Sequence, residues 1–249
     1  NGPYVSAPGQ TLTIASVGKV DVPNPLYDPN GTQPITIKRD YGFGATPGKV
    51  TLGGVPLTNV IWTDGSIQGT VAPNTKTGEL IITRSSGVSS PVGITVTVGP
   101  ISGTVLQVQP SSAPGATPIQ NAIDAAHPGD LILVAPGTYD EMVIMWQPVL
   151  LQGWGPYCTT INAVKTPAEK LQAWRDKVAS LITLGKVDLL PGQNFDFTGI
   201  EPATFNTEEG AGIFVMARNT SPDNGGFGPG NARIDGFTIT GADHGEALR

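Results

Sequence analysis

The chain has 249 residues, of which 33 are glycine and 23 are proline, and only 14% are charged. This composition disfavours helical bundles and coiled coils, while 39% hydrophobic residues suffice for a packed core. A net charge of −6 argues against nucleic-acid binding, because phosphate contacts need an excess of Lys and Arg. No apolar run reaches the roughly 20 residues that span a membrane. The single cysteine, Cys158, excludes an intrachain disulfide.

Short runs rich in β-branched residues, separated by turn-forming residues, dominate the first hundred positions. They predict seven strands, at 11–14, 35–37, 50–52, 59–62, 69–71, 80–83 and 94–98. Between them, Gly53-Gly54 suits a hairpin turn, because glycine adopts positive φ without a Cβ clash. Residues 1–99 are therefore expected to form a β-sandwich.

Part of this region resembles the IPT/TIG immunoglobulin-like family, over about residues 30–98. The resemblance rests on residues 35–37, 41–44, 48–54, 62–64 and 78–83. It implies an immunoglobulin-like sandwich that acts as a spacer and binding module at the cell surface or outside the cell. The family has no catalytic residues that could be transferred to this chain.

Residues 100–117 are rich in Pro, Ser and Gly, which is typical of a linker. Thr117, Pro118 and Gln120 then predict the start of a helix, with Thr117 as the N-cap residue. The apolar face of this helix would consist of residues spaced three and four apart, namely Ile119, Ala122, Ile123 and Ala126.

From about residue 117 to 249 the chain resembles the right-handed parallel β-helix proteins of the pectin-lyase-like superfamily. The segments that carry this resemblance are 119–126, 129–139, 143–144, 149–153, 159–162 and 232–241. The resemblance implies that the helix at 119–126 caps the first coil. It indicates architecture rather than chemistry, because this superfamily contains lyases, hydrolases, adhesins and inert shafts. The expected fold class is all-β, a sandwich followed by a parallel β-helix.

Residues 163–210 break the coil pattern and are expected to form a partly helical insertion. Residues 166–177 predict a helix, and an apolar stripe would pack it on the side of the solenoid. The stripe consists of Leu171, Trp174, Val178 and Leu181.

A parallel solenoid buries its core only by stacking neighbouring coils, so about three or more coils are expected. Residues 118–249 contain too few coil segments to meet this requirement by themselves. We therefore expect a C-terminal continuation of the polypeptide, or a partner chain, to stack on the open end of the β-helix.

These features favour an exported protein, secreted or at the cell surface, with a structural or binding role inside a larger β-helical polypeptide or assembly. The alternative is a carbohydrate-active enzyme, a polysaccharide lyase or glycoside hydrolase, with polysaccharide bound in a groove on the β-helix. In that case the catalytic candidates are Asp235, Asp243 and His244, because carboxylates and imidazole transfer protons.

No cofactor is expected, and the sequence identifies no metal site. Calcium would suit the oxygen-rich loops at 28–31 and 223–224, but neither matches the twelve-residue calcium-loop pattern with its closing Glu, and turn formation is the favoured explanation of both. Asp140 and Glu141 follow the predicted Pro-Gly-Thr-Tyr turn of the first coil, and we expect them to be solvated turn residues.

Overall fold

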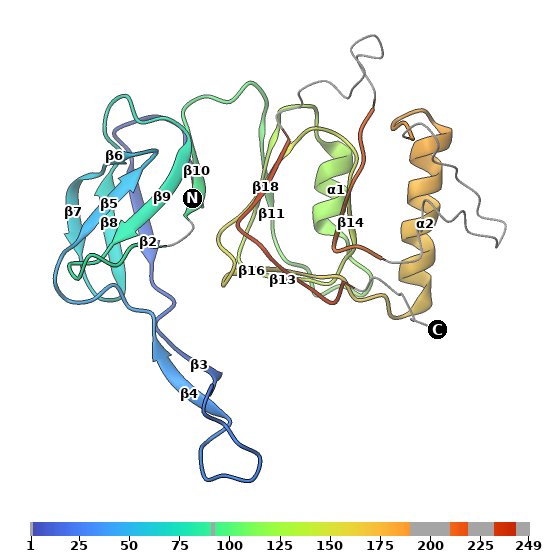
Figure 1. Cartoon of the computed structure of the whole chain (residues 1–249). Helices are drawn as coiled ribbons and strands as arrows, with labels where there is room; N and C mark the ends of the chain where they lie inside the picture. Colours follow the sequence, from blue (N-terminus) through green and yellow to red (C-terminus); the bar gives the residue numbers. More distant parts are fainter. Residues whose placement is uncertain (1, 91–92, 190–209, 219–231, 243–249) are drawn as a thin grey trace. The chain divides into compact units, whose positions relative to one another are not determined.

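The computed structural model describes two compact units, residues 3–100 and residues 101–249 (Figure 1). The positions described are residues 2–90, 93–189, 210–218 and 232–242. Their regular structure is mainly β, with two helices among the described residues. This confirms the all-β expectation at the level of class.

The first unit contains two sheets that enclose one hydrophobic core. The five-stranded sheet has the order β1 (Tyr4–Val5), β10 (Ile94–Val98), β9 (Gly78–Thr83), β5 (Lys49–Leu52) and β6 (Val55–Pro56). The three-stranded sheet has the order β2 (Thr11–Ala15), β8 (Ser66–Thr70) and β7 (Thr58–Trp62). All pairs in these two sheets are antiparallel except β1 with β10. The core between them includes Leu12, Val50, Leu52, Ile67, Val71 and Val96.

A separate hairpin, β3 (Lys19–Pro23) with β4 (Thr36–Asp40), extends away from the two sheets of this unit (Figure 1). All five residues of β4 are exposed, so the strand expected at 35–37 exists but contributes nothing to the core. Asn24 organises the connecting loop, since its side chain accepts the Leu26 N–H at 3.0 Å and donates to the Pro34 carbonyl at 2.8 Å.

The second unit contains three parallel sheets, which we call the parallel stack. The first sheet has the order β11 (Val105–Val108), β12 (Leu131–Val134), β15 (Leu150–Gly153) and β18 (Arg233–Asp235). The second consists of β13 (Gly137–Tyr139), β16 (Thr159–Asn162) and β19 (Thr238–Thr240), and the third of β14 (Val143–Met145) and β17 (Ile213–Val215). Successive strands from β12 onward therefore belong to the first, second and third sheet in turn. Each strand from β15 onward pairs in parallel with the strand three places earlier in the chain.

The core of the parallel stack is built from aliphatic residues of neighbouring strands. All four residues of β12 are fully buried, as expected for a parallel strand that is covered on both faces.

The backbones of Gly153 and Gly236 approach each other closely in the parallel stack. A Cβ atom on either glycine would lie 2.3 Å from the carbonyl oxygen of the other, so this corner of the stack excludes side chains.

The expected linker at residues 100–117 is partly wrong. Val105–Val108 forms β11, which pairs in parallel with β12 over its whole length. The parallel stack thus begins before the helix, and residues 101–117 belong to the second unit. Composition concealed this strand, because its four residues lie between stretches rich in Gly, Ser and Pro.

Helix α1 (Pro118–Ala125) begins where the sequence predicted, and Ile119 and Ile123 are fully buried in the core of the stack. Helix α2 (Ala168–Thr183) is longer than the predicted segment 166–177. Its predicted stripe packs as expected. Trp174, Val178 and Leu181 are buried, and Leu171 is half-buried, in a cluster that also contains Met142, Ile144 and Phe214.

Asp130 joins the start of the stack to the end of α1. Its buried carboxylate accepts the Thr104 N–H at 2.6 Å and the His127 N–H at 2.8 Å. The hydrogen bonds from His127 and Thr104 hold the pKa of Asp130 below its ordinary value, although burial opposes them. A lowered pKa means that the ionised carboxylate stabilises the fold above its ordinary pKa, and this contribution is lost as pH falls.

We expect Asp130→Asn to lower the free energy of unfolding by about 1 kcal/mol at neutral pH, because the amide replaces an ionised acceptor of two N–H groups. Urea unfolding from pH 7 down to pH 3 measures the effect, and the difference from wild type should shrink as pH falls. Asp176→Asn, at an exposed residue of α2, is the control and should change little. A difference that grows in acid would contradict the assignment.

Candidate functional site

A cavity of about 550 Å³ lies between α1, α2 and the segment that leads into β14. This volume falls in the range of small-molecule sites. Its charged lining residues are Asp124, Asp140, Glu141, Glu169, Lys170 and Lys177. Met142, Ile144, Ala173 and Trp174 contribute apolar surface. None of these residues was among the predicted catalytic residues, since Asp140 and Glu141 were expected to be solvated turn residues and Trp174 to pack against the solenoid.

The carboxylate of Glu141 caps the N-terminus of α1. It accepts the Ile119 N–H at 2.9 Å and the Gln120 N–H at 3.0 Å, while the side chain of Thr117 makes no capping bond. Thr117 occupies the N-cap position, as predicted, but its side chain does not supply the capping bonds. The prediction that Glu141 is solvated is wrong, because its exposed fraction is 2%. The Glu141 carboxylate, from the connection between β13 and β14, therefore satisfies the free N–H groups that the side chain of Thr117 was expected to satisfy.

Burial raises the pKa of Glu141 above its ordinary value, although the hydrogen bonds from Gln120 and Ile119 and the charge of Lys170 partly offset this. Both carboxylate oxygens are engaged by the helix. This engagement assigns Glu141 a structural role in the wall of the cavity rather than proton transfer.

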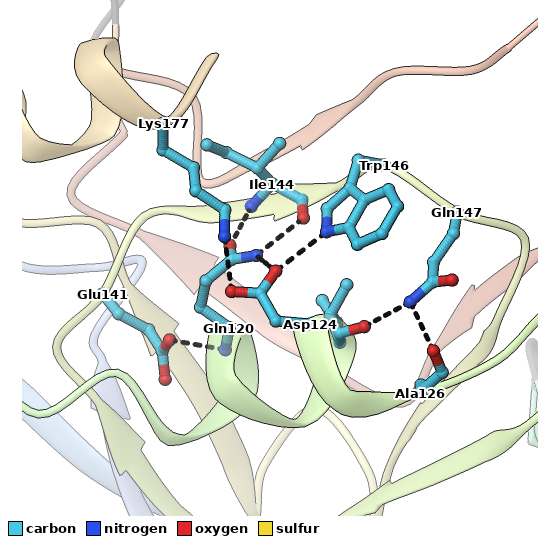
Figure 2. Close-up of polar contacts among 9 residues, drawn as sticks. Gln120, Asp124, Ala126, Glu141, Ile144, Trp146, Gln147 and Lys177 are labelled. Atoms are coloured by element: carbon cyan, nitrogen blue, oxygen red, sulfur yellow. Dashed lines mark hydrogen bonds and ion pairs between the residues drawn. The ribbon is translucent and has the colours of Figure 1, made fainter. Parts of the chain in front are cut away.

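Two glutamines bind α1 to the chain around β14 (Figure 2). Gln120 lies on the helix, and its amide accepts the Ile144 N–H at 2.7 Å and donates to the Ile144 carbonyl at 3.2 Å. Gln147 donates to the carbonyls of Ile123 and Ala126 at the other end of the helix. The segment 141–147 therefore contacts α1 at its start, its middle and its end.

Asp124 connects α1 to α2 (Figure 2). Its Oδ2 atom lies 2.5 Å from Nζ of Lys177, which belongs to α2. Its Oδ1 atom accepts hydrogen bonds from the indole Nε1 of Trp146 at 2.8 Å and from Nε2 of Gln120 at 3.0 Å. One carboxylate thus holds groups from three parts of the chain at the edge of the cavity.

A second polar group lies where α2 begins. Lys170 donates to the backbone carbonyl of Asp140 at 3.0 Å, and Oδ1 of Asp140 accepts from the amide of Asn162 at 2.7 Å. Glu169 is exposed, and no described residue forms an ion pair or hydrogen bond with its side chain. The lining therefore combines paired ammonium groups with carboxylate oxygens that still have capacity to accept.

Of the three predicted catalytic residues, only Asp235 lies within the described part of the chain. It sits on β18 near Arg233, and burial lowers the pKa of Arg233 while the charge of Asp235 raises it. Arg233 also donates to Oε1 of Gln152 at 3.1 Å. Asp243 and His244 lie outside the described residues, so the grouping of these three residues stays a prediction.

Metal-binding side chains do not gather in the described ranges, where no three His, Cys, Asp or Glu residues form a group able to hold an ion. In the loop at 28–31, Oδ1 of Asp28 accepts the Asn30 N–H at 2.9 Å, as in an ordinary turn. The loop at 223–224 lies outside the described residues. Neither helix of the described chain is long and apolar enough to cross a membrane.

Glu141→Gln tests the buried cap. Because the pKa of Glu141 is raised in the folded state, its contribution to stability is full below the ordinary pKa and is lost as pH rises through the raised pKa. The stability of Glu141→Gln lacks this pH dependence, and the substitution should lower the free energy of unfolding by about 1–3 kcal/mol at pH 4. Its deficit relative to wild type should narrow toward pH 8, as measured by urea unfolding. A deficit that widens with pH would contradict burial as the dominant cause.

Asp124→Ala and Lys177→Met test the connection between the helices. The Lys177–Asp124 pair is one-third exposed on each side, so Lys177→Met should cost less than about 1 kcal/mol. Asp124→Ala also removes the acceptor of Trp146 and Gln120, and it should cost about 1–3 kcal/mol. A double-mutant cycle in thermal unfolding measures the coupling. Equal costs for the two variants would rule out the connecting role of Asp124.

Comparison with known proteins assigns no family to this architecture. No protein-family model, no curated protein and no solved structure matches the chain.

Proposed function

We propose that the chain is part of an exported structural or binding protein, secreted or at the cell surface, that forms a larger β-helical polypeptide or assembly. In this proposal, the first unit is an immunoglobulin-like sandwich of IPT/TIG type, and the second contains the first coils of a right-handed parallel β-helix. The in-register parallel sheets and the buried helix at their start support the second assignment. Two facing antiparallel sheets around one core support the first.

The observation that carries the proposal is a change in burial between neighbouring strands of the parallel stack. Met145, Leu151 and Ile161 are at most 1% exposed. Their partners on the last described strand of each sheet are Val215, Ile234 and Ile239. These partners are exposed by 56%, 38% and 46%.

This pattern favours a further coil that stacks on β17, β18 and β19. Aliphatic residues of an added coil would cover the exposed side chains of Val215, Ile234 and Ile239. These three side chains pair in the same way with the buried Met145, Leu151 and Ile161. We assign this coil to a C-terminal continuation of the same polypeptide, so that the described strands form the start of a longer shaft.

The enzyme alternative has less support among the described residues. Polysaccharide lyases and glycoside hydrolases need several carboxylates, or carboxylates and a metal ion, at one place. Asp235 lies near Arg233, and no three His, Cys, Asp or Glu side chains of the described ranges form a group able to hold a metal ion. Of the acidic side chains that line the cavity, Asp124 is paired with Lys177, and Glu141 accepts hydrogen bonds from the N-terminus of α1. The exposed aliphatic side chains of β17, β18 and β19 favour assembly.

The test begins with the mass of the natural protein. We expect an intact mass above 25.7 kDa, the mass of these 249 residues, and peptides that continue past Arg249. If a separate chain co-purifies instead, the added coil belongs to a partner chain and not to a continuation of this polypeptide. A monomer of 25.7 kDa would overturn the proposal.

A matched pair of variants tests the stacking itself in the natural protein. Ile234→Asp places a charge where the added coil would bury it and should lower the free energy of unfolding by about 2 kcal/mol or more. Ile37→Asp is the control, because Ile37 is 39% exposed on the hairpin of the first unit. Equal effects of the two substitutions would show that nothing covers β18.

A further inference from the structure

A line of polar side chains connects successive coils of the parallel stack. Asp140, Asn162 and Thr240 occupy equivalent positions, because each directly follows one of three residues that pair in register across β13, β16 and β19. Nδ2 of Asn162 donates to Oδ1 of Asp140 at 2.7 Å, and Oγ1 of Thr240 donates to Oδ1 of Asn162 at 3.2 Å. We call these three residues the polar ladder. In each bond the later residue donates and the earlier one accepts.

The direction of these bonds fits what each side chain can do. An ionised aspartate only accepts, so Asp140 suits the first position, whereas the amide of Asn162 both donates and accepts. The hydroxyl proton of Thr240 is used in the bond to Asn162, but its oxygen can still accept. Thr240 is exposed, and no described residue donates to its oxygen. The polar ladder therefore ends, within the described chain, in an acceptor without a donor.

Gly241 makes room for the last bond of the polar ladder. A Cβ atom at this position would lie 2.7 Å from Oδ1 of Asn162, the atom to which Thr240 donates. The φ of Gly241 is +68°, in a region that residues with a side chain rarely adopt. The backbone after Thr240 is therefore shaped around this bond, which sets it apart from a chance contact between exposed side chains.

We propose that the coil which stacks on β19 places an Asn, Ser or Thr side chain above Thr240, where it donates to Oγ1, directly after an aliphatic residue that covers Ile239. Continuity with the described contact carries this inference, because two coils already repeat an aliphatic residue followed by a donor, Ile161-Asn162 and Ile239-Thr240. Asp or Glu would not fit, since an ionised carboxylate has no proton to donate. The inference rests on the coil proposed above and adds the chemistry that holds it.

The backbone amide of Ile239 reports on the added coil. The carbonyl of Thr240 accepts the Ala163 N–H, so Thr240 directs its backbone groups toward β16. Neighbouring residues of a strand direct these groups to opposite sides, which points the Ile239 N–H toward the added coil. Its hydrogen exchange in the natural protein should therefore be slow. Fast exchange in the unsubstituted protein would overturn the coil, and the ladder with it.

Thr240→Val tests the ladder separately from the coil, because it keeps the shape of the side chain and removes the hydroxyl. It is made in an Asn162→Ala background, where the bond below Thr240 is already lost and any further effect comes from the added coil. Exchange of the Ile239 amide should become about fivefold faster, as expected for the loss of one hydrogen bond. Thr138→Val in the same background is the control, at an exposed residue of β13 outside the ladder.

Slow exchange that Thr240→Val leaves unchanged would show that the coil exists but that the ladder ends at Thr240, and this result would overturn the proposal. Equal effects of Thr240→Val and Thr138→Val would also overturn it, and circular dichroism checks that each variant is folded. The sequence past Arg249 gives an independent check. Its coil segment equivalent to residues 234–240 should end in Asn, Ser or Thr, and an acidic or aliphatic residue at that place would contradict the ladder.

Discussion

The second unit depends on how the polar backbone groups at the two ends of α1 are satisfied. This helix inserts two isoleucines into an aliphatic core, and its free N–H and C=O groups would be costly there without partners. The segment 141–147 supplies those partners through the Glu141 carboxylate and the Gln147 amide, while Gln120 of the helix binds the backbone of β14. Helix and strand therefore fix each other's position.

The cavity follows from the same arrangement. Because the segment 141–147 contacts α1 along one side, the polar side chains of that side gather next to the chain that leads into β14. Helix α2 then covers this group from outside, and it is held by an apolar cluster and by Lys177. The cavity is lined by both charged and aliphatic side chains because the amphipathic helix α2 packs next to the N-terminus of α1.

Local patterns predicted the parts of this structure that local physics determines. Pro118 marked the start of α1, the spacing of Trp174, Val178 and Leu181 marked the buried face of α2, and β-branched runs marked most strands. Strand β11 and the role of Glu141 were missed for a common reason. Each depends on a partner more than twenty residues away, with β12 pairing β11 and α1 engaging Glu141, and composition contains no record of such pairings.

The insertion between β16 and β17 has a consequence for the order of folding. β15 pairs with β12 across a short connection, whereas β17 pairs with β14, and β18 with β15, only after the chain has closed much longer loops. Loop closure costs more entropy as the loop grows, and pairings of high sequence separation form slowly. The first strands and α1 would form a nucleus during synthesis, and each later strand would join it as on a template. Growth by this route would proceed in one direction, away from the strands that pack against α1.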